Sequence, residues 1–357
     1  MADVTSFRAI RYARPTAGVV APPYDVLDEA ARAELRARDP HNVVHLTLDP
    51  SEEEAGRRFR AWLEEGVLVH EDQPAAWVVE QAYVGPDGLS RTRTGLVASL
   101  GAEPYETRAV LPHERTHAGP KESRLRLLRA ARAQLEPIFL LYDGEPPFTT
   151  PEREPDLEAD GTRLWRVDGA ALPAFFADRQ LLIADGHHRY ETTVAYAAED
   201  PREGSNRLLV VLVSTTDPGL EIFPTHRLFV GRPDIDPPGE ERSDLAAALG
   251  ALASAPYDAS VAVFYRDGVV RFVEGEPGEL DVELVDRFGH EGIAYTPDLD
   301  DAISRVDSGA AGCAFLLRAT RIEDVFVRAR RGEVMPQKTT YFFPKLLSGL
   351  LFLPLDG

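Results

Sequence analysis

Three continuous apolar runs constrain the fold of this chain more than any other feature of its sequence. They read PIFLLYD at 137–143, LLIAD at 181–185 and RLLVVLVST at 207–215. Short apolar runs of this kind predict buried β-strands. Helical patterns separate the runs, and the segments 76–84 and 89–100 flank a Gly-Pro-Asp-Gly turn, which predicts an antiparallel hairpin. Because strands alternate with helices and hairpins also occur, we expect a mixed α/β or α+β fold.

The 357 residues suffice for one large domain or two closely packed ones. A segment rich in proline and acids, GRPDIDPPGEER at 231–242, predicts a linker. We therefore expect an α/β core over residues 1–230 and a further α/β portion over 243–357. Within the latter, Met335–Lys345 is a candidate to fold back onto the site of the first part. Apolar periodicity predicts helices at 26–38, 52–66, 123–134, 190–200, 243–254 and 321–330.

Charge and composition exclude several classes of protein. Lys+Arg is 39 and Asp+Glu is 59, which leaves a net charge of −20. A field of this sign repels phosphate backbones, so a nucleic-acid partner is disfavoured, although a small anion pocket remains compatible with it. The start lacks the apolar core of a signal peptide, no run approaches the length of a membrane span, and Cys313 is the single cysteine. We expect a soluble, cytoplasmic protein without a membrane partner; a homo-oligomer is left open.

The strongest local signal follows the second apolar run, where the chain reads Asp185-Gly186-His187-His188-Arg189. Gly186 permits a tight turn with positive φ, and a helix is expected to begin two or three residues later. Unpaired N–H groups and the dipole at a helix start favour an anion. Two imidazoles and a guanidinium add donors suited to phosphate oxygens. This turn therefore predicts an anion site.

Asp185 has two interpretations from the sequence. Its carboxylate, at the end of a strand, could bind Mg²⁺ or accept a proton from a hydroxyl group. It could equally cap the following helix. Because His187 and His188 point in different directions on a helix, at most one of them is a natural partner of Asp185.

A second cluster reads Leu111-Pro112-His113-Glu114-Arg115-Thr116-His117 and contains the His-Glu-x-x-His pattern of zinc proteases. Its context does not suit that class, because prolines interrupt the pattern on both sides, whereas a zinc protease needs a long buried helix there. We therefore expect His113 and Glu114 to be polar site residues on a loop, with Lys121 at the start of the next helix.

Two further segments carry weaker signals. Thr225-His226-Arg227 places a pair of cationic side chains after the strand at 207–215, and Pro22-Pro23-Tyr24-Asp25 forms a rigid turn that presents Tyr24 and Asp25. Either segment could instead be an ordinary solvated loop.

Lysine is rare in this arginine-rich chain and occurs only at Lys121, Lys338 and Lys345. These positions could be places where a compact ammonium is needed and a planar guanidinium does not serve. Alternatively, lysine could have remained at these three positions by chance.

Ordered motifs over most of the chain resemble the bacterial and archaeal family called domain of unknown function 1015. They are Pro22-Pro23-Tyr24-Asp25-Val26, Asp39-Pro40-His41-Asn42, Leu111-Pro112-His113-Glu114 with Pro120-Lys121, Ala184 to Thr192, Thr225-His226-Arg227, and Met335-Pro336-Gln337-Lys338 through Lys345-Leu346. His117 is not part of that family's pattern, which weakens the zinc-protease interpretation further.

The Asp-Gly-His-His-Arg turn also resembles, more remotely, the phosphate-binding turn of the ParB/sulfiredoxin-like superfamily. That resemblance implies a ParB/sulfiredoxin-like core and nucleotide binding, and some members of that superfamily are free-serine kinases. The DUF1015 family tends to be encoded beside enzymes of serine biosynthesis, which would fit a role related to phosphoserine. Nothing in the composition or spacing names serine.

Our leading hypothesis is a small-molecule phosphotransferase, most plausibly a free amino-acid (serine) kinase or another phosphoserine-related enzyme, which uses ATP or ADP with Mg²⁺. Phosphoryl transfer needs positioning and charge neutralisation more than covalent chemistry. The expected roles are a catalytic group of Asp185, Glu114 and His187, with Asp185 also the metal ligand; phosphate contacts from Gly186, His187, His188, Arg189, His226, Arg227, Lys121 and Lys338; and substrate contacts from His113, Tyr24 and Asp25.

Two alternatives share the same anion site. A phosphatase of a small phosphorylated metabolite would hold the phosphate there while water attacks. A non-catalytic protein would only bind a nucleotide or a phosphorylated metabolite. Dependence on a nucleotide separates the kinase from the phosphatase, and turnover separates both from a binding protein.

Overall fold

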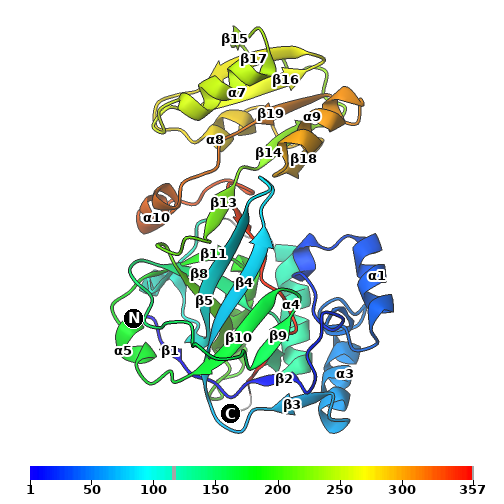
Figure 1. Cartoon of the computed structure of the whole chain (residues 1–357), viewed down its shortest axis with the longest axis vertical. Helices are drawn as coiled ribbons and strands as arrows, with labels where there is room; N and C mark the ends of the chain where they lie inside the picture. The colour runs from blue at the N-terminus through cyan, green and yellow to red at the C-terminus, as the bar shows by residue number, and fades with distance from the viewer. Residues whose placement is uncertain (115–117, 356–357) are drawn as a thin grey trace.

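The chain folds into a larger and a smaller α/β unit, which lie one above the other in Figure 1. A computed structural model describes residues 1–114 and 118–355. Within these residues, the larger unit is built on a nine-stranded mixed sheet and the smaller one on a six-stranded sheet. The mixed α/β class predicted from the sequence is confirmed.

The larger unit is formed from both ends of the chain. Its strands are β1 (Val4–Thr5), β2 (Ile10–Tyr12), β3 (Leu68–His70), β4 (Ala76–Val84), β5 (Ser90–Gly101), β6 (Val110–Leu111), β7 (Ala133–Gln134), β8 (Ile138–Tyr142), β9 (Leu157–Ala159), β10 (Thr162–Val167), β11 (Leu181–Asp185), β12 (Arg207–Ser214), β13 (Glu221–Phe223), β20 (Tyr341–Phe343) and β21 (Leu353–Pro354). Its helices are α1 (Glu29–Arg38), α2 (Val44–Thr47), α3 (Glu52–Glu64), α4 (Ala118–Ala131), α5 (Leu172–Phe176), α6 (His187–Glu199) and α10 (Ile322–Arg330), with the 3₁₀ turns η1 (Tyr24–Val26) and η2 (Tyr105–Thr107).

The smaller unit comes from the middle of the second half. Its elements are β14 (His226–Phe229), β15 (Glu240–Glu241), α7 (Leu245–Ser254), β16 (Val261–Arg266), β17 (Val269–Glu274), α8 (Asp281–Asp286), β18 (Ile293–Thr296), α9 (Leu299–Asp307) and β19 (Cys313–Leu316). They form a sheet of order β15-β17-β16-β19-β14-β18.

The three apolar runs become β8, β11 and β12, three neighbours in the larger sheet of order β6-β11-β8-β12-β5-β4-β10-β9. Side chains alternate across a strand, and both faces of β12 are covered: Leu209 and Val211 join one core cluster, Leu208 and Val210 the other. Burial on both faces explains why these strands are apolar throughout rather than alternating with polar residues. The predicted hairpin is also present, as β4 and β5 paired from Trp77 opposite Val97 to Val84 opposite Ser90.

Helix starts differ from the predictions where a local cap decides them. The helix expected from residue 26 begins at Glu29, because Asp28 caps it by accepting a hydrogen bond from Ala31 N at 2.8 Å. Residues 24–26 form η1 instead. The helix expected from residue 190 begins at His187, a shift that matters for the site.

The chain enters the smaller unit earlier than the predicted linker. Because β14 pairs with both β18 and β19, the segment 231–242 lies inside this unit, where β15 pairs with β17. After β19 the chain returns: β20 pairs with β13, and β21 pairs with β7 of the larger unit. In Figure 1, α10 lies at the junction of the two units, and the red final segment runs along the larger sheet. These pairings join distant residues, which local composition cannot indicate.

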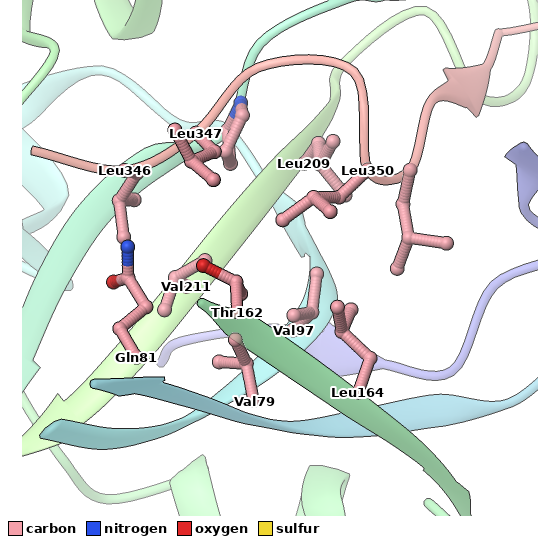
Figure 2. A pocket seen from close by; sticks show the side chains of 12 residues that line it. Val79, Gln81, Val97, Thr162, Leu164, Leu209, Val211, Leu346, Leu347 and Leu350 are labelled. Carbon is pink, nitrogen blue, oxygen red and sulfur yellow. The ribbon is translucent and has the colours of Figure 1, made fainter. Parts of the chain in front are cut away.

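The returning segment covers one face of the larger sheet. Leu346, Leu347 and Leu350 face Val79, Val97 and Leu209 across a small apolar cavity, which Figure 2 shows from close by. The C-terminal residues are thus part of the core of the larger unit. Among residues 1–114 and 118–355, no helix combines the length and apolarity that a membrane crossing requires.

Candidate functional site

The turn between β11 and α6 is built around Gly186. This residue is the N-cap of α6 and has a φ of 102°, a conformation that glycine adopts without strain. A Cβ at this position would lie 2.5 Å from a methyl group of Ile138, so close packing also requires glycine. Because α6 begins immediately afterwards, His187, His188 and Arg189 all lie in its first turn.

This turn forms one side of an open pocket of about 1000 Å³, its mouth included. Four segments far apart in the sequence meet there: Tyr24 and Asp25, Glu114, residues 184–189, and the returning segment 337–345. Glu114 reaches the pocket because β6 runs parallel to β11, so that both strands end at the same edge of the sheet. Crevices at the carboxyl ends of parallel strands are common places for ligands.

Asp185 is held between two cations. Its Oδ1 accepts from Lys345 Nζ at 2.5 Å, and its Oδ2 accepts from Arg189 Nη2 at 2.7 Å. Burial raises the pKa of Asp185, but Lys345 and Arg189 outweigh burial and hold that pKa well below its usual range. The carboxylate is therefore ionised at any physiological pH. An acid this strong is a poor acceptor for a hydroxyl proton.

The Arg189 guanidinium forms its hydrogen bonds within the protein. Besides Asp185, its guanidinium donates to the Pro137 carbonyl at 2.5 Å, and the side chain is buried. Two of its nitrogens are thus committed to acceptors within the protein. The geometry gives Arg189 a role in holding Asp185 at the edge of the pocket.

Two imidazoles are buried side by side behind the turn. The His113 backbone N–H donates to His187 Nε2 at 3.3 Å, which places the His187 proton on Nδ1. The His113 ring donates from Nδ1 to the Ile183 carbonyl at 2.6 Å and accepts at Nε2 from Thr340 Oγ1 at 3.0 Å. Burial lowers the pKa of His113 to about 4 and that of His187 well below its usual value. Both rings are neutral at pH 7.

Glu114 is a second carboxylate in the pocket, and its pKa is raised, whereas that of Asp185 is lowered. Burial raises its pKa, although the charge of Lys338 and a hydrogen bond from the Lys338 backbone N–H oppose the rise. The adjoining backbone is fixed by a hydrogen bond from Met335 N to the His113 carbonyl at 2.8 Å. A carboxylate with a raised pKa in a pocket is a candidate proton acceptor near neutral pH.

The first turn of α6 supplies backbone donors at the pocket. Tyr190 N is the first to bond back into the helix, to the Gly186 carbonyl at 3.0 Å. The N–H groups of 187–189 therefore precede the hydrogen-bond ladder, at the helix end that lines the pocket. With the exposed Lys338 in the same pocket, this end of α6 is suited to an anion.

The returning segment is anchored by Arg93, a buried residue of β5. Its guanidinium donates to the carbonyls of Phe343 at 3.3 Å and Pro344 at 2.7 Å, and to Gln81 Oε1 at 2.5 Å. Burial lowers the pKa of Arg93 to about 10, so the group stays charged at pH 7. Arg93 thereby fixes the backbone that precedes Lys345.

The structure brings most of the predicted site residues together. Tyr24, Asp25, Glu114, Asp185, Gly186, His187, His188, Arg189 and Lys338 all line the pocket. Tyr24 is placed by a hydrogen bond from its N–H to Glu136 and by the Arg124 guanidinium, 4.3 Å from its ring centre.

Other predicted residues lie elsewhere. His113 is only 1% exposed and stands behind the pocket wall, whereas Lys121 is paired with Glu191 on α6. His226 and Arg227 belong to β14 in the smaller unit, where His226 Nδ1 accepts from Leu317 N and Arg227 lies 3.6 Å from Asp286. These two side chains are buried in the packing of β14 and do not line the pocket. The zinc-protease pattern falls partly on residues 115–117, outside the described residues.

Thr340, Tyr341 and Lys345 also line the pocket. They belong to the segment Met335–Lys345, which the sequence offered as a candidate to fold back onto the site, although none of the three received an individual role. The scarcity of lysine had singled out Lys345 as a position that could need a compact ammonium. Nothing local to the sequence could have shown that it pairs with Asp185, 160 residues away.

The pocket does not fit a resident Mg²⁺ on Asp185. Both oxygens of this carboxylate are already engaged by cations, which leaves it unsuited to a third positive partner. Over residues 1–114 and 118–355, no group of three or more His, Cys, Asp or Glu side chains is placed to hold a metal ion.

The fold and pocket define a mixed α/β protein with a polar pocket at the carboxyl ends of β6 and β11. The family model described as "Protein of unknown function (DUF1015)" matches residues 4–262, and the chain belongs to this family. The resemblance seen in the sequence motifs is thereby confirmed. A comparison with curated proteins gives no match.

Several solved structures are similar at low identity. A conserved hypothetical protein from Pyrococcus furiosus has 17% identity and a TM-score of 0.40, with 70% of this chain and 93% of that chain covered. A free serine kinase in complex with AMP has 17% identity and a TM-score of 0.40, with 68% and 89% covered. C-terminally truncated SbnI from Staphylococcus aureus has 13% identity and a TM-score of 0.41, with 69% and 84% covered.

Proposed function

We propose that this protein is a small-molecule phosphotransferase that moves a phosphoryl group from a nucleotide to a hydroxyl group, with free serine as the acceptor. The main support for this proposal is that one pocket contains both a candidate anion site and a carboxylate of raised pKa. The candidate anion site is the start of α6 together with Lys338, and the carboxylate is that of Glu114. Serine is proposed on the remote resemblance of the Asp-Gly-His-His-Arg turn to the phosphate-binding turn of the ParB/sulfiredoxin-like superfamily, some members of which are free-serine kinases.

The proposed roles follow from charge and position. The N–H groups of 187–189, His188 and Lys338 bind the phosphates. Glu114 accepts the proton of the acceptor hydroxyl, whose oxygen attacks the terminal phosphorus while the bond to the nucleoside diphosphate breaks. Asp185, locked by Lys345 and Arg189, positions the turn instead of acting as the base. Mg²⁺ would enter with the nucleotide, because phosphate oxygens supply most of its ligands in such complexes.

The test is turnover of the purified protein with Mg²⁺, ATP and L-serine, with ADP and phosphoserine measured by mass spectrometry. We expect both products in equal amounts. Glu114→Gln should lower kcat by roughly 10²- to 10⁴-fold, the range for a general base. Glu34→Gln is the matched control, because Glu34 is an exposed residue of α1 and does not line the pocket; it should keep the wild-type rate.

Other results point to other functions. Release of phosphate from phosphoserine without nucleotide would make the protein a phosphatase. A thermal shift with ATP but no product would make it a binding protein. Wild-type turnover by Glu114→Gln would remove Glu114 from the chemistry.

A further inference from the structure

A second cavity adjoins the anion pocket. It has a volume of about 740 Å³, its mouth included, and shares Tyr341 and Lys345 with the anion pocket. The turn around η1 also borders both, since Tyr24 and Asp25 line the anion pocket and Val26 lines the second cavity. The two cavities are therefore neighbouring parts of one bipartite site.

The second cavity differs from the anion pocket in chemistry. Half-buried rings line it: the Phe343 ring centre lies 5.4 Å from that of Tyr83 and 5.9 Å from that of Tyr341. We call this cavity the aromatic lobe and define it by Val26, Ala82, Tyr83, Asp160, Tyr341 and Phe343. Its charged lining groups are the exposed Asp160 carboxylate and, at the boundary with the anion pocket, Lys345.

We propose that the aromatic lobe receives the base of the nucleotide whose phosphates occupy the anion pocket, an inference that rests on the proposed function. A nucleotide carries a planar, weakly polar ring at one end and its charge at the other, which matches an aromatic cavity beside an anion pocket. An acceptor as small as serine has no apolar group that would need such a lobe.

The boundary between the two cavities suits the part of a nucleotide between base and phosphates. The Lys345 ammonium lies 5.6 Å from the ring centre of Tyr341, so charge and aromatic surface meet there. Asp160 at the open side can accept hydrogen bonds from sugar hydroxyls or an exocyclic amine, as acidic residues do in other nucleotide sites.

The experiment separates the two lobes with two fragments of ATP. Adenosine carries base and sugar without phosphate, and pyrophosphate carries charge without base; binding of each is measured by calorimetry. Ala82→Trp fills the aromatic lobe, since Ala82 is an exposed residue of β4 and no packed group is removed. Lys338→Met alters the anion pocket only. Ala33→Trp, on the exposed side of α1, is the matched control.

We expect Ala82→Trp to weaken the binding of adenosine and of ATP at least tenfold and to leave the binding of pyrophosphate unchanged. Lys338→Met should weaken the binding of pyrophosphate and leave that of adenosine unchanged. Ala33→Trp should change the binding of neither fragment. The inference is overturned if Ala82→Trp leaves adenosine and ATP binding unchanged, or weakens pyrophosphate as much as adenosine.

This test is independent of turnover. If adenosine binding depends on Ala82 but no phosphoserine forms, the proposed function fails and the base site stands. If Ala82→Trp forms phosphoserine with an unchanged KM for ATP, the base site falls and the proposed function stands. If instead only KM for the acceptor rises, the lobe holds the acceptor and the inference is wrong.

Discussion

Lys345→Met removes one of the two cations on Asp185 and keeps most of the apolar stem of the side chain. Asp185 and Lys345 are each only 17% exposed, and the ammonium lies 2.5 Å from the carboxylate. Losing one partner of a fully buried pair costs about 3–5 kcal/mol. Because Arg189 remains bound to Asp185, we expect a smaller loss of about 2–3 kcal/mol, near the value for a hydrogen bond to a charged group.

The loss of unfolding free energy in Lys345→Met should become smaller as the pH is lowered. The pKa of Asp185 is depressed in the folded protein because Lys345 and Arg189 outweigh the effect of burial. The stability that this ion pair contributes is therefore fully present above the unfolded pKa of about 3.9. It is lost as pH falls below that value toward the depressed folded pKa. The difference in unfolding free energy between wild type and Lys345→Met should shrink over that acid range.

Urea unfolding at pH 7 and at a series of acid pH values measures both effects. Lys121→Met is the matched control, because Lys121 also forms an ion pair, with Glu191, but in a more exposed setting of 34% and 23%; a loss below about 1 kcal/mol is expected there. A double-mutant cycle with Asp185→Asn should show coupling between the two positions. Equal losses in the two lysine variants, or no coupling, would refute the reasoning.

Three further predictions concern the same site. Gly186→Ala should destabilise the protein by about 1–3 kcal/mol in thermal unfolding, since alanine would meet both the φ of 102° and the Ile138 side chain; an unchanged midpoint would contradict this. Arg93→Met should destabilise by at least about 2 kcal/mol, because three acceptors lose their buried donor, and should also raise KM for ATP through the misplaced Lys345; unaltered urea unfolding would count against it. For the wild type, kcat should rise with pH through the raised pKa of Glu114, whose base form is the deprotonated one; a pH profile that is flat between 4 and 8 would exclude that role.

Much of the site could be predicted because it is local. The end of an apolar strand followed by Asp-Gly places Asp185, Gly186 and His187 at a strand-to-helix turn, and the structure has them there. The position of Glu114 needs only one additional fact, that β6 lies parallel to β11. The local pattern could not predict the protonation state of each group, because burial and charged partners set its pKa.

The smaller unit shows where local reasoning fails. Thr225-His226-Arg227 has the composition of an anion site, yet β14 pairs with β18 and β19, and its side chains are buried in that sheet. The proline-rich segment 231–242 likewise reads as a linker but lies within the smaller unit. Pairing between distant strands decides both outcomes, and local composition does not indicate which strand will be the partner.

The sequence by itself determined the buried strands and the glycine turn at the start of α6, because each of these depends on residues adjacent in the chain. It also determined the family, because the order of short motifs along the chain can be compared without knowing which residues meet in space. Only the tertiary structure decided that Lys345 neutralises Asp185, that Glu114 is the carboxylate with a raised pKa, and that the aromatic lobe adjoins the anion pocket. These properties arise from charges and rings brought together across more than a hundred residues, and their energies depend on distance and burial rather than on order along the chain.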